Sequence, residues 1–169
     1  MPAPSKSSAD FGVTLSVLDR LMDKEPDQSS EGFVARAQSI RELKAAVRRD
    51  LERLLNTRRI AVEPEESLQE VNRSVYIYGL PDFTAMGLAS RPEKVKLLRS
   101  LQATIKMFEP RLTNVRIVPL EVPGVKTNTL RFRIEALLLM DPAPEQISFD
   151  TFLDLTRSEC RIQRDVDAR

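Results

Sequence analysis

With 169 residues, 41% of them hydrophobic and 30% charged, the chain has the size and composition of one globular domain. Its 26 lysines and arginines balance 25 aspartates and glutamates, which gives no electrostatic case for a nucleic-acid partner, and no apolar run approaches the about 18 residues of a membrane span. The absence of histidine and the single cysteine exclude Ser-His-Asp and Cys-His catalytic sites and the usual zinc sites, so neither a cofactor nor a metal is expected.

The first 36 residues are expected to form a tail, a short helix and a linker. Pro26 and Gly32 interrupt any regular pattern in the linker. The short helix is predicted over residues 15–23, and it can dock in a groove of a neighbouring protein or pack on its own domain. Its apolar face consists of Leu15, Leu18, Leu21 and Met22.

Two stronger helices are predicted next, and each begins with capping-box spacing, Ser39 with Glu42 and Ser90 with Glu93. The apolar face of the first helix, which is expected to end near residues 56–59, comprises Ile40, Leu43, Val47, Leu51, Leu54 and Leu55. That of the second comprises Val95, Leu98, Leu101, Ile105 and Phe108. Pro110 ends the second helix because its ring cannot continue the hydrogen-bond ladder.

Three strands are predicted over residues 115–122, 130–140 and 147–155, where apolar residues recur at every second position. Their short connections favour an antiparallel meander. Because Leu137 and Leu139 are also apolar, the second half of the middle strand is expected to be covered on both faces. The predicted fold class is α+β, with N-terminal helices packed on a small three-stranded antiparallel sheet in the C-terminal half.

The two outer strands of such a sheet leave main-chain groups unpaired. Pro119 protects the edge formed by the first strand, because proline cannot donate a main-chain hydrogen bond. The strand over residues 147–155 would then form the edge that is open to a strand from a partner. We expect the domain itself to span residues 37–156, followed by a C-terminal tail over residues 157–169.

Four strings, in this order and spacing, carry a family resemblance. They are Ser16-Val17-Leu18-Asp19-Arg20-Leu21, the segment 39–59 with Leu55-Asn56-Thr57-Arg58-Arg59 at its end, Ser74-Val75 followed by Tyr78-Gly79-Leu80-Pro81-Asp82, and Glu109-Pro110-Arg111. Over about residues 11–156 the chain resembles the TssE family, the baseplate wedge subunits of type VI secretion systems. That family is akin to a wedge protein in the tails of contractile phages.

The resemblance implies a non-catalytic structural subunit of a cytoplasmic baseplate docked at the inner membrane. The implied partners are the wedge proteins TssF and TssG, the adaptor TssK, and the sheath proteins TssB and TssC, whose first ring the family templates by strand pairing. The Glu-Pro-Arg signature of the family falls on Glu109, Pro110 and Arg111, which are therefore implied as sheath-binding residues. Without the resemblance, the same three residues read as a helix stop with a surface ion pair.

Arg58 and Arg59, together with Leu15 and Leu18, are candidate contacts to a wedge partner. The arginine pair also fits two other interpretations, a helix end anchored in its own domain or a solvated helix face.

Two rival functions stay open beside the baseplate. A murein hydrolase would use Glu109 as its acid and would need a second carboxylate at a set separation. An anti-adaptor regulator that shares the fold would bind a response regulator. No carboxylate lies in a recognisable catalytic context, so we expect a protein that is not an enzyme, and the Glu-Pro-Arg and Leu-Asn-Thr-Arg-Arg strings favour the baseplate.

Overall fold

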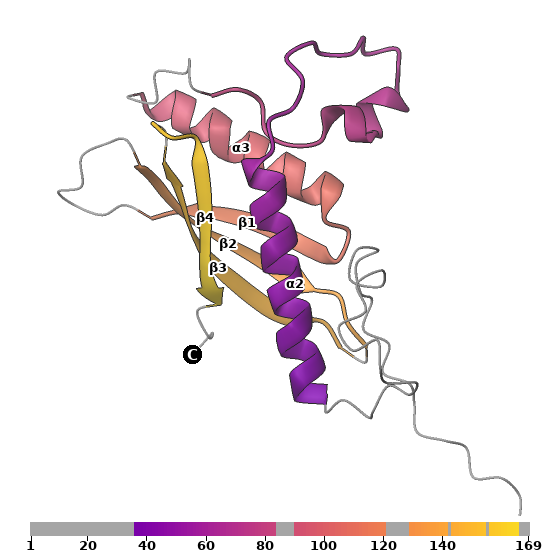
Figure 1. Cartoon of the computed structure of the whole chain (residues 1–169), viewed down its shortest axis with the longest axis vertical. Helices are drawn as coiled ribbons and strands as arrows, with labels where there is room; N and C mark the ends of the chain where they lie inside the picture. Colours follow the sequence, from indigo (N-terminus) through magenta and orange to yellow (C-terminus); the bar gives the residue numbers. More distant parts are fainter. Residues whose placement is uncertain (1–35, 84–89, 121–128, 142, 155, 166–169) are drawn as a thin grey trace, which may run out of the picture.

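The computed structural model describes residues 36–83, 90–120, 129–141, 143–154 and 156–165. Two α-helices, two short 3₁₀ helices and four strands follow one another along these residues (Figure 1). The predicted helix over residues 15–23, with Leu15 and Leu18, lies outside the described part of the chain.

The sheet is antiparallel and has the order β1-β2-β3-β4. Its strands are β1 (Leu112–Pro119), β2 (Thr129–Leu138), β3 (Glu145–Asp154) and β4 (Glu159–Asp165). The α+β class is confirmed and the Pro119 strand lies at an edge, but the prediction of three strands is wrong.

The missed strand, β4, lies within the segment that was expected to be a C-terminal tail. It pairs with β3 from Asp154 opposite Glu159 onward, so the β3 edge that was expected to be open is occupied by the chain itself. Of the side chains that the structure describes in this strand, Cys160 and Ile162 are the buried ones, between polar neighbours. Two apolar residues are too few for a period-two pattern to stand out in the sequence.

Helices α2 (Arg36–Asn56) and α3 (Arg91–Phe108) contribute to the same hydrophobic core as the strands. Helix α2 contacts β4, α3 contacts β1, and the two helices contact each other (Figure 1). Along β2 and β3, buried side chains alternate with half-buried ones, so one face of the sheet carries the core. The largest buried core side chains include Phe83, Phe132, Phe149, Leu51, Leu97 and Leu101.

The second half of β2 is not covered on both faces, contrary to expectation. Leu137 is half-buried and Leu139, just beyond the strand, is 49% exposed. The apolar residues of this stretch therefore lie alternately on the core face and on the open face of the sheet. This is possible because one face of an antiparallel sheet can remain solvated.

The capping prediction holds for one helix and fails for the other. Ser90 caps α3 as expected, because its Oγ accepts a hydrogen bond from Glu93 N at 3.4 Å and donates one to Glu93 Oε2 at 2.9 Å. Helix α2 begins at Arg36, so Ser39 lies within it instead of at its start. Helix α3 ends at Phe108, directly before Glu109 and Pro110.

The connection from α2 to α3 contains the 3₁₀ helices η1 (Val71–Arg73) and η2 (Val75–Ile77) and returns to the end of α2 at Gly79. Gly79 has φ +100°, and a Cβ there would lie 2.4 Å from Thr57 O, so glycine meets two demands at this position. Leu80 N then donates to Thr57 O, and Arg59 N donates to Leu80 O, each at 2.9 Å. The expected turn at Gly79 is thereby fixed to the C-terminal end of α2.

Candidate interaction site

The Glu-Pro-Arg corner between α3 and β1 is a partly buried ion-pair network. Arg111 Nε donates to Glu109 Oε1 at 2.6 Å, and Arg111 Nη2 donates to Glu109 Oε2 at 2.5 Å. The same Nη2 donates to Asp50 Oδ2 of helix α2 at 2.8 Å. Glu109 is only 4% exposed. One guanidinium therefore joins the end of α3, the start of β1 and the middle of α2.

The electrostatics of this corner favour the charged form of Arg111 and the neutral form of Tyr78. Burial opposes the charge of Arg111, but the hydrogen bonds to Glu109 and Asp50 outweigh it and raise the pKa of Arg111 above its ordinary value. Burial also raises the pKa of Tyr78, and the charges of Asp50 and Glu109 add to that effect. Arg111 Nη1 is buried and has no hydrogen-bond partner among the described residues. The corner thus holds one donor that its own carboxylates do not use.

Sequence reasoning identified Glu109, Pro110 and Arg111 but missed Asp50. A signal for it was present, because residue 50 falls between Val47 and Leu54 at helical spacing, on the apolar face of α2. A carboxylate on a buried helix face requires a cation or a set of donors beside it. Pro110 itself is exposed, so the corner presents its proline and not its carboxylate to solvent.

The outer edge of β4 is closed by the side-chain amide of Asn56, the last residue of α2. Asn56 Nδ2 donates to Cys160 O at 2.8 Å, and Cys160 N donates to Asn56 Oδ1 at 2.7 Å. These are the two hydrogen bonds that a residue of a neighbouring strand would form. Ile162 N, further along the same edge, donates to Glu52 Oε1 at 3.4 Å.

The two predicted arginine contacts lie at this end of α2, where the structure gives both side chains partners within the chain. Arg58 Nη2 donates to Ser158 O at 2.6 Å, and its guanidinium lies over the ring of Phe83 at 4.4 Å. Burial lowers the pKa of Arg58. Arg59 forms an ion pair with Glu63 at 2.6 Å. The geometry matches the anchored helix end, and a wedge contact by either arginine stays a prediction.

The outer edge of β1 has a different structure. Leu120 N donates to Arg131 O at 2.9 Å, and Pro119 lies opposite Phe132 in the register. Because hydrogen-bonded and non-hydrogen-bonded pairs alternate in an antiparallel ladder, the N–H and C=O of Ile117 point away from β2. Pro119 has the same orientation and no N–H to offer.

The start of β1 is irregular and its edge there is covered. The register shifts between Thr113 and Arg116, and Asn114 has φ 54°. Gln102 Nε2 of α3 donates to Val115 O at 2.8 Å. Among the residues that the structure describes, the uncovered part of the edge is therefore short, from Arg116 to Pro119, and Ile117 supplies its one complete donor and acceptor.

Neither a metal site nor a membrane span is found in the part of the chain that the structure describes. No group of three or more cysteine, aspartate or glutamate side chains in these residues could hold a metal ion. None of the described helices is long and apolar enough to cross a bilayer.

Comparison with known proteins gives one result. The family model described as "Baseplate wedge protein gp25" matches residues 41–143, which extend from α2 to the turn after β2. No curated protein and no solved structure matches the chain significantly.

Proposed function

The chain belongs to the gp25 family of baseplate wedge proteins, and we propose that it is a non-catalytic structural subunit of a type VI secretion baseplate. In that role it bridges wedge proteins and templates the contractile sheath by strand pairing. The coarser role, a structural component of a phage-tail-like baseplate, follows from the family itself. The finer one rests on the four strings that resemble TssE and on the free edge of β1.

The observation that carries strand pairing is the outward N–H and C=O of Ile117. An extended arm from a sheath subunit would align with β1 over residues 116–119 and satisfy both groups. Pro119 C=O, which points in the same direction, would accept a further hydrogen bond. The sequence pattern predicted the open edge on β3, but β4 occupies that edge, so the arm would pair with β1 instead.

Glu109, Pro110 and Arg111 support this edge as the proposed sheath-binding corner. Their ion pairs fix the point at which α3 turns into β1, so they set the direction in which β1 leaves the helix. Pro110 is the exposed part of the corner that an incoming chain can reach.

The proposed partners beyond the sheath proteins TssB and TssC are TssF, TssG and TssK, in a cytoplasmic baseplate docked at the inner membrane. Leu15, Leu18, Arg58 and Arg59 are the proposed contacts to the wedge proteins. Since Arg58 and Arg59 are held within the chain, a wedge contact there would meet their exposed edges and the fixed end of α2.

The geometry of Glu109 argues against the murein hydrolase. A general acid must reach its substrate and hold a proton, but both oxygens of Glu109 accept hydrogen bonds from Arg111, and the residue is 4% exposed. We expect that neither the wild type nor Glu109→Gln lowers the turbidity of a peptidoglycan suspension. Cleavage by the wild type that this substitution abolishes would instead establish an enzyme.

The baseplate role is tested by reconstitution. We expect the chain to co-purify with TssF, TssG and TssK, and its deletion to abolish fluorescent TssB sheaths in cells. Normal sheath assembly in the deletion strain would contradict the proposal.

A further inference from the structure

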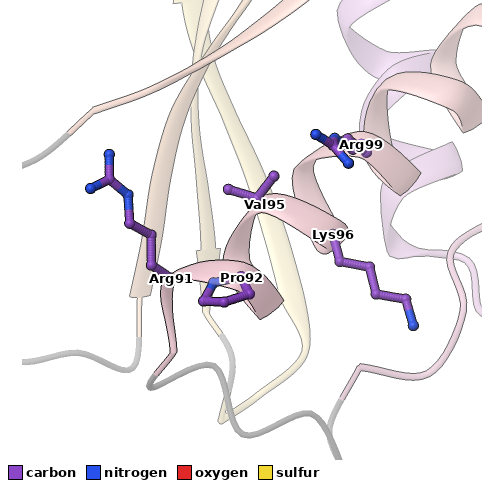
Figure 2. Close-up of a pocket in the computed structure, with 5 residues that line it drawn as sticks. All are labelled: Arg91, Pro92, Val95, Lys96 and Arg99. Atoms are coloured by element: carbon purple, nitrogen blue, oxygen red, sulfur yellow. The ribbon is translucent and has the colours of Figure 1, made fainter.

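A shallow hollow on α3 is used neither by the corner nor by the sheet edges. Its lining comes from the first half of the helix: Arg91, Pro92, Val95, Lys96 and Arg99. Figure 2 shows Val95 between Arg91 and Arg99 along the helix, with Lys96 extending from the neighbouring position. Val95 is 38% exposed, so this α3 hollow combines an uncovered apolar floor with a rim of cations.

The charge on α3 is one-sided. The helix carries five cations, Arg91, Lys94, Lys96, Arg99 and Lys106, and a single carboxylate, Glu93, which is bonded to Ser90 at the cap. No ion pair reaches any of the five within the described ranges, whereas Lys44 on α2 lies 2.7 Å from Glu145. A chain with a net charge of +1 thus gathers unneutralised positive charge on one helix.

These positions do not help the helix to fold. Arg91 with Lys94 and Lys96 with Arg99 are like-charge pairs three residues apart, and each such pair is unfavourable by about 0.2–0.5 kcal/mol. Cations near the N-terminal end of a helix also oppose its dipole. Since stability gives no reason for this arrangement, a negatively charged partner is the physical explanation that fits it.

We propose that the α3 hollow docks an acidic segment of another protein, with carboxylates on the rim and one apolar side chain against Val95 and Pro92. Carboxylates can form charge-assisted hydrogen bonds to Arg91, Lys96 and Arg99. The apolar floor favours a protein segment over nucleic acid, because a phosphate backbone gains nothing from Val95 and no aromatic ring lines the hollow for a base to stack on. It also favours a protein over a membrane surface, where larger apolar side chains would enter the bilayer. This inference is independent of strand pairing at β1.

A selection from a library of short random peptides against the full-length chain tests the proposal. We expect the enriched peptides to be acidic and to carry at least one apolar residue. In fluorescence anisotropy, K96E/R99E should weaken their binding by at least about tenfold, and added salt should weaken binding to the wild type. Val95→Ala should weaken it by about two- to fivefold through lost apolar contact.

The matched control is R41E/R73E, which makes the same change in net charge at two exposed arginines outside the hollow. This variant should bind the selected peptides nearly as well as the wild type. Both double variants should keep the wild-type melting temperature, because none of the four side chains is buried. Enrichment of peptides without acidic excess, equal loss in the two variants, or no enrichment at all would overturn the proposal. So would tighter binding, through Lys96 and Arg99, to duplex DNA or to phosphatidylglycerol vesicles.

Discussion

The two outer strands of the sheet protect their edges in different ways. The edge of β4 is closed by side chains of α2, since Asn56 makes both hydrogen bonds to Cys160 and Glu52 reaches Ile162. The edge of β1 is closed only in part, by the irregularity at Asn114 and by Pro119, and no described residue pairs with the outward main-chain groups of Ile117. Exposed edges are a liability that proteins remove unless a partner covers them. The difference favours β1 over β4 as the edge for the proposed partner strand.

The same comparison extends to how each strand is held. Strand β1 is fixed at its first end by Arg111, which reaches both α3 and α2. Strand β4 is held along its edge by two side chains of α2, the neutral amide of Asn56 and the carboxylate of Glu52. The start of β1 depends on a buried ion pair, whereas the edge of β4 depends mainly on a neutral amide. Substitution of Arg111 should therefore lower the free energy of unfolding more than substitution of Asn56.

The largest effect is expected at the β1 end of the comparison. Arg111→Met removes the cation that neutralises the buried Glu109, and we expect a loss of about 3–5 kcal/mol in the free energy of unfolding. The double variant E109Q/R111M should recover a large part of that loss, because it leaves no unpaired charge on either residue. Urea denaturation of the three proteins measures both quantities. A loss below about 1 kcal/mol for Arg111→Met would show that solvent, and not Arg111, satisfies the corner.

The next effect concerns pH and the β4 end. Burial raises the pKa of Cys160 to about 12 from its ordinary value of 9.0, and the nearby charge of Glu52 adds to the shift. A raised pKa stabilises the folded state fully below pH 9, and this contribution is lost as pH rises toward 12. We expect the free energy of unfolding to fall by roughly 2–4 kcal/mol over that interval.

Cys160→Val keeps the apolar contacts of the strand and removes the titrating thiol. Chemical denaturation at a series of alkaline pH values should show a smaller fall for this variant, with the residual slope coming from groups such as Tyr78. An identical fall in the two proteins would mean that β4 does not bury this thiol in solution.

A smaller loss is expected when the amide that closes β4 is removed. Asn56→Ala leaves the N–H and C=O of Cys160 without partners, at about 1–3 kcal/mol. The thiol of Cys160 should also react faster with a disulfide reagent, because β4 can leave the sheet more often. Arg53→Ala, on the same turn of α2 and exposed, is the control and should change neither value much. Unchanged thiol reactivity in Asn56→Ala would show that the amide is not what holds this edge.

Sequence patterns located helices α2 and α3 and strands β1 to β3, because each of these elements carries several apolar residues at a regular spacing. They failed at β4, where Cys160 and Ile162 are the buried residues among those described, and at Ser39, whose capping-box spacing lies inside a helix. The residues of the candidate site also include some that could be predicted from the sequence and one that could not. Glu109 and Arg111 lie two residues apart in sequence and were found through the resemblance, whereas Asp50 joins them only through the packing of α2 against the corner.

The closure of β4 could not be predicted from local pattern. In the sequence, Asn56 looks like an ordinary residue at the end of a helix. Its hydrogen bonds to Cys160 join residues 104 positions apart. The sequence analysis assigned the open edge to β3 because it did not predict β4, which pairs with β3. Only the pairing register shows that the bare main-chain groups belong to Ile117 on the opposite edge.

The measurement that tests pairing at β1 most directly compares Ile117→Pro with Ile117→Ala. Both variants lose the same half-buried side chain, but only proline removes the outward N–H, and neither touches a bond of β1 to β2. We predict similar melting temperatures for the two proteins. Fluorescent sheath assembly and co-purification of sheath proteins should be retained by Ile117→Ala and lost by Ile117→Pro. Equal sheath assembly with both variants would contradict strand pairing at this edge.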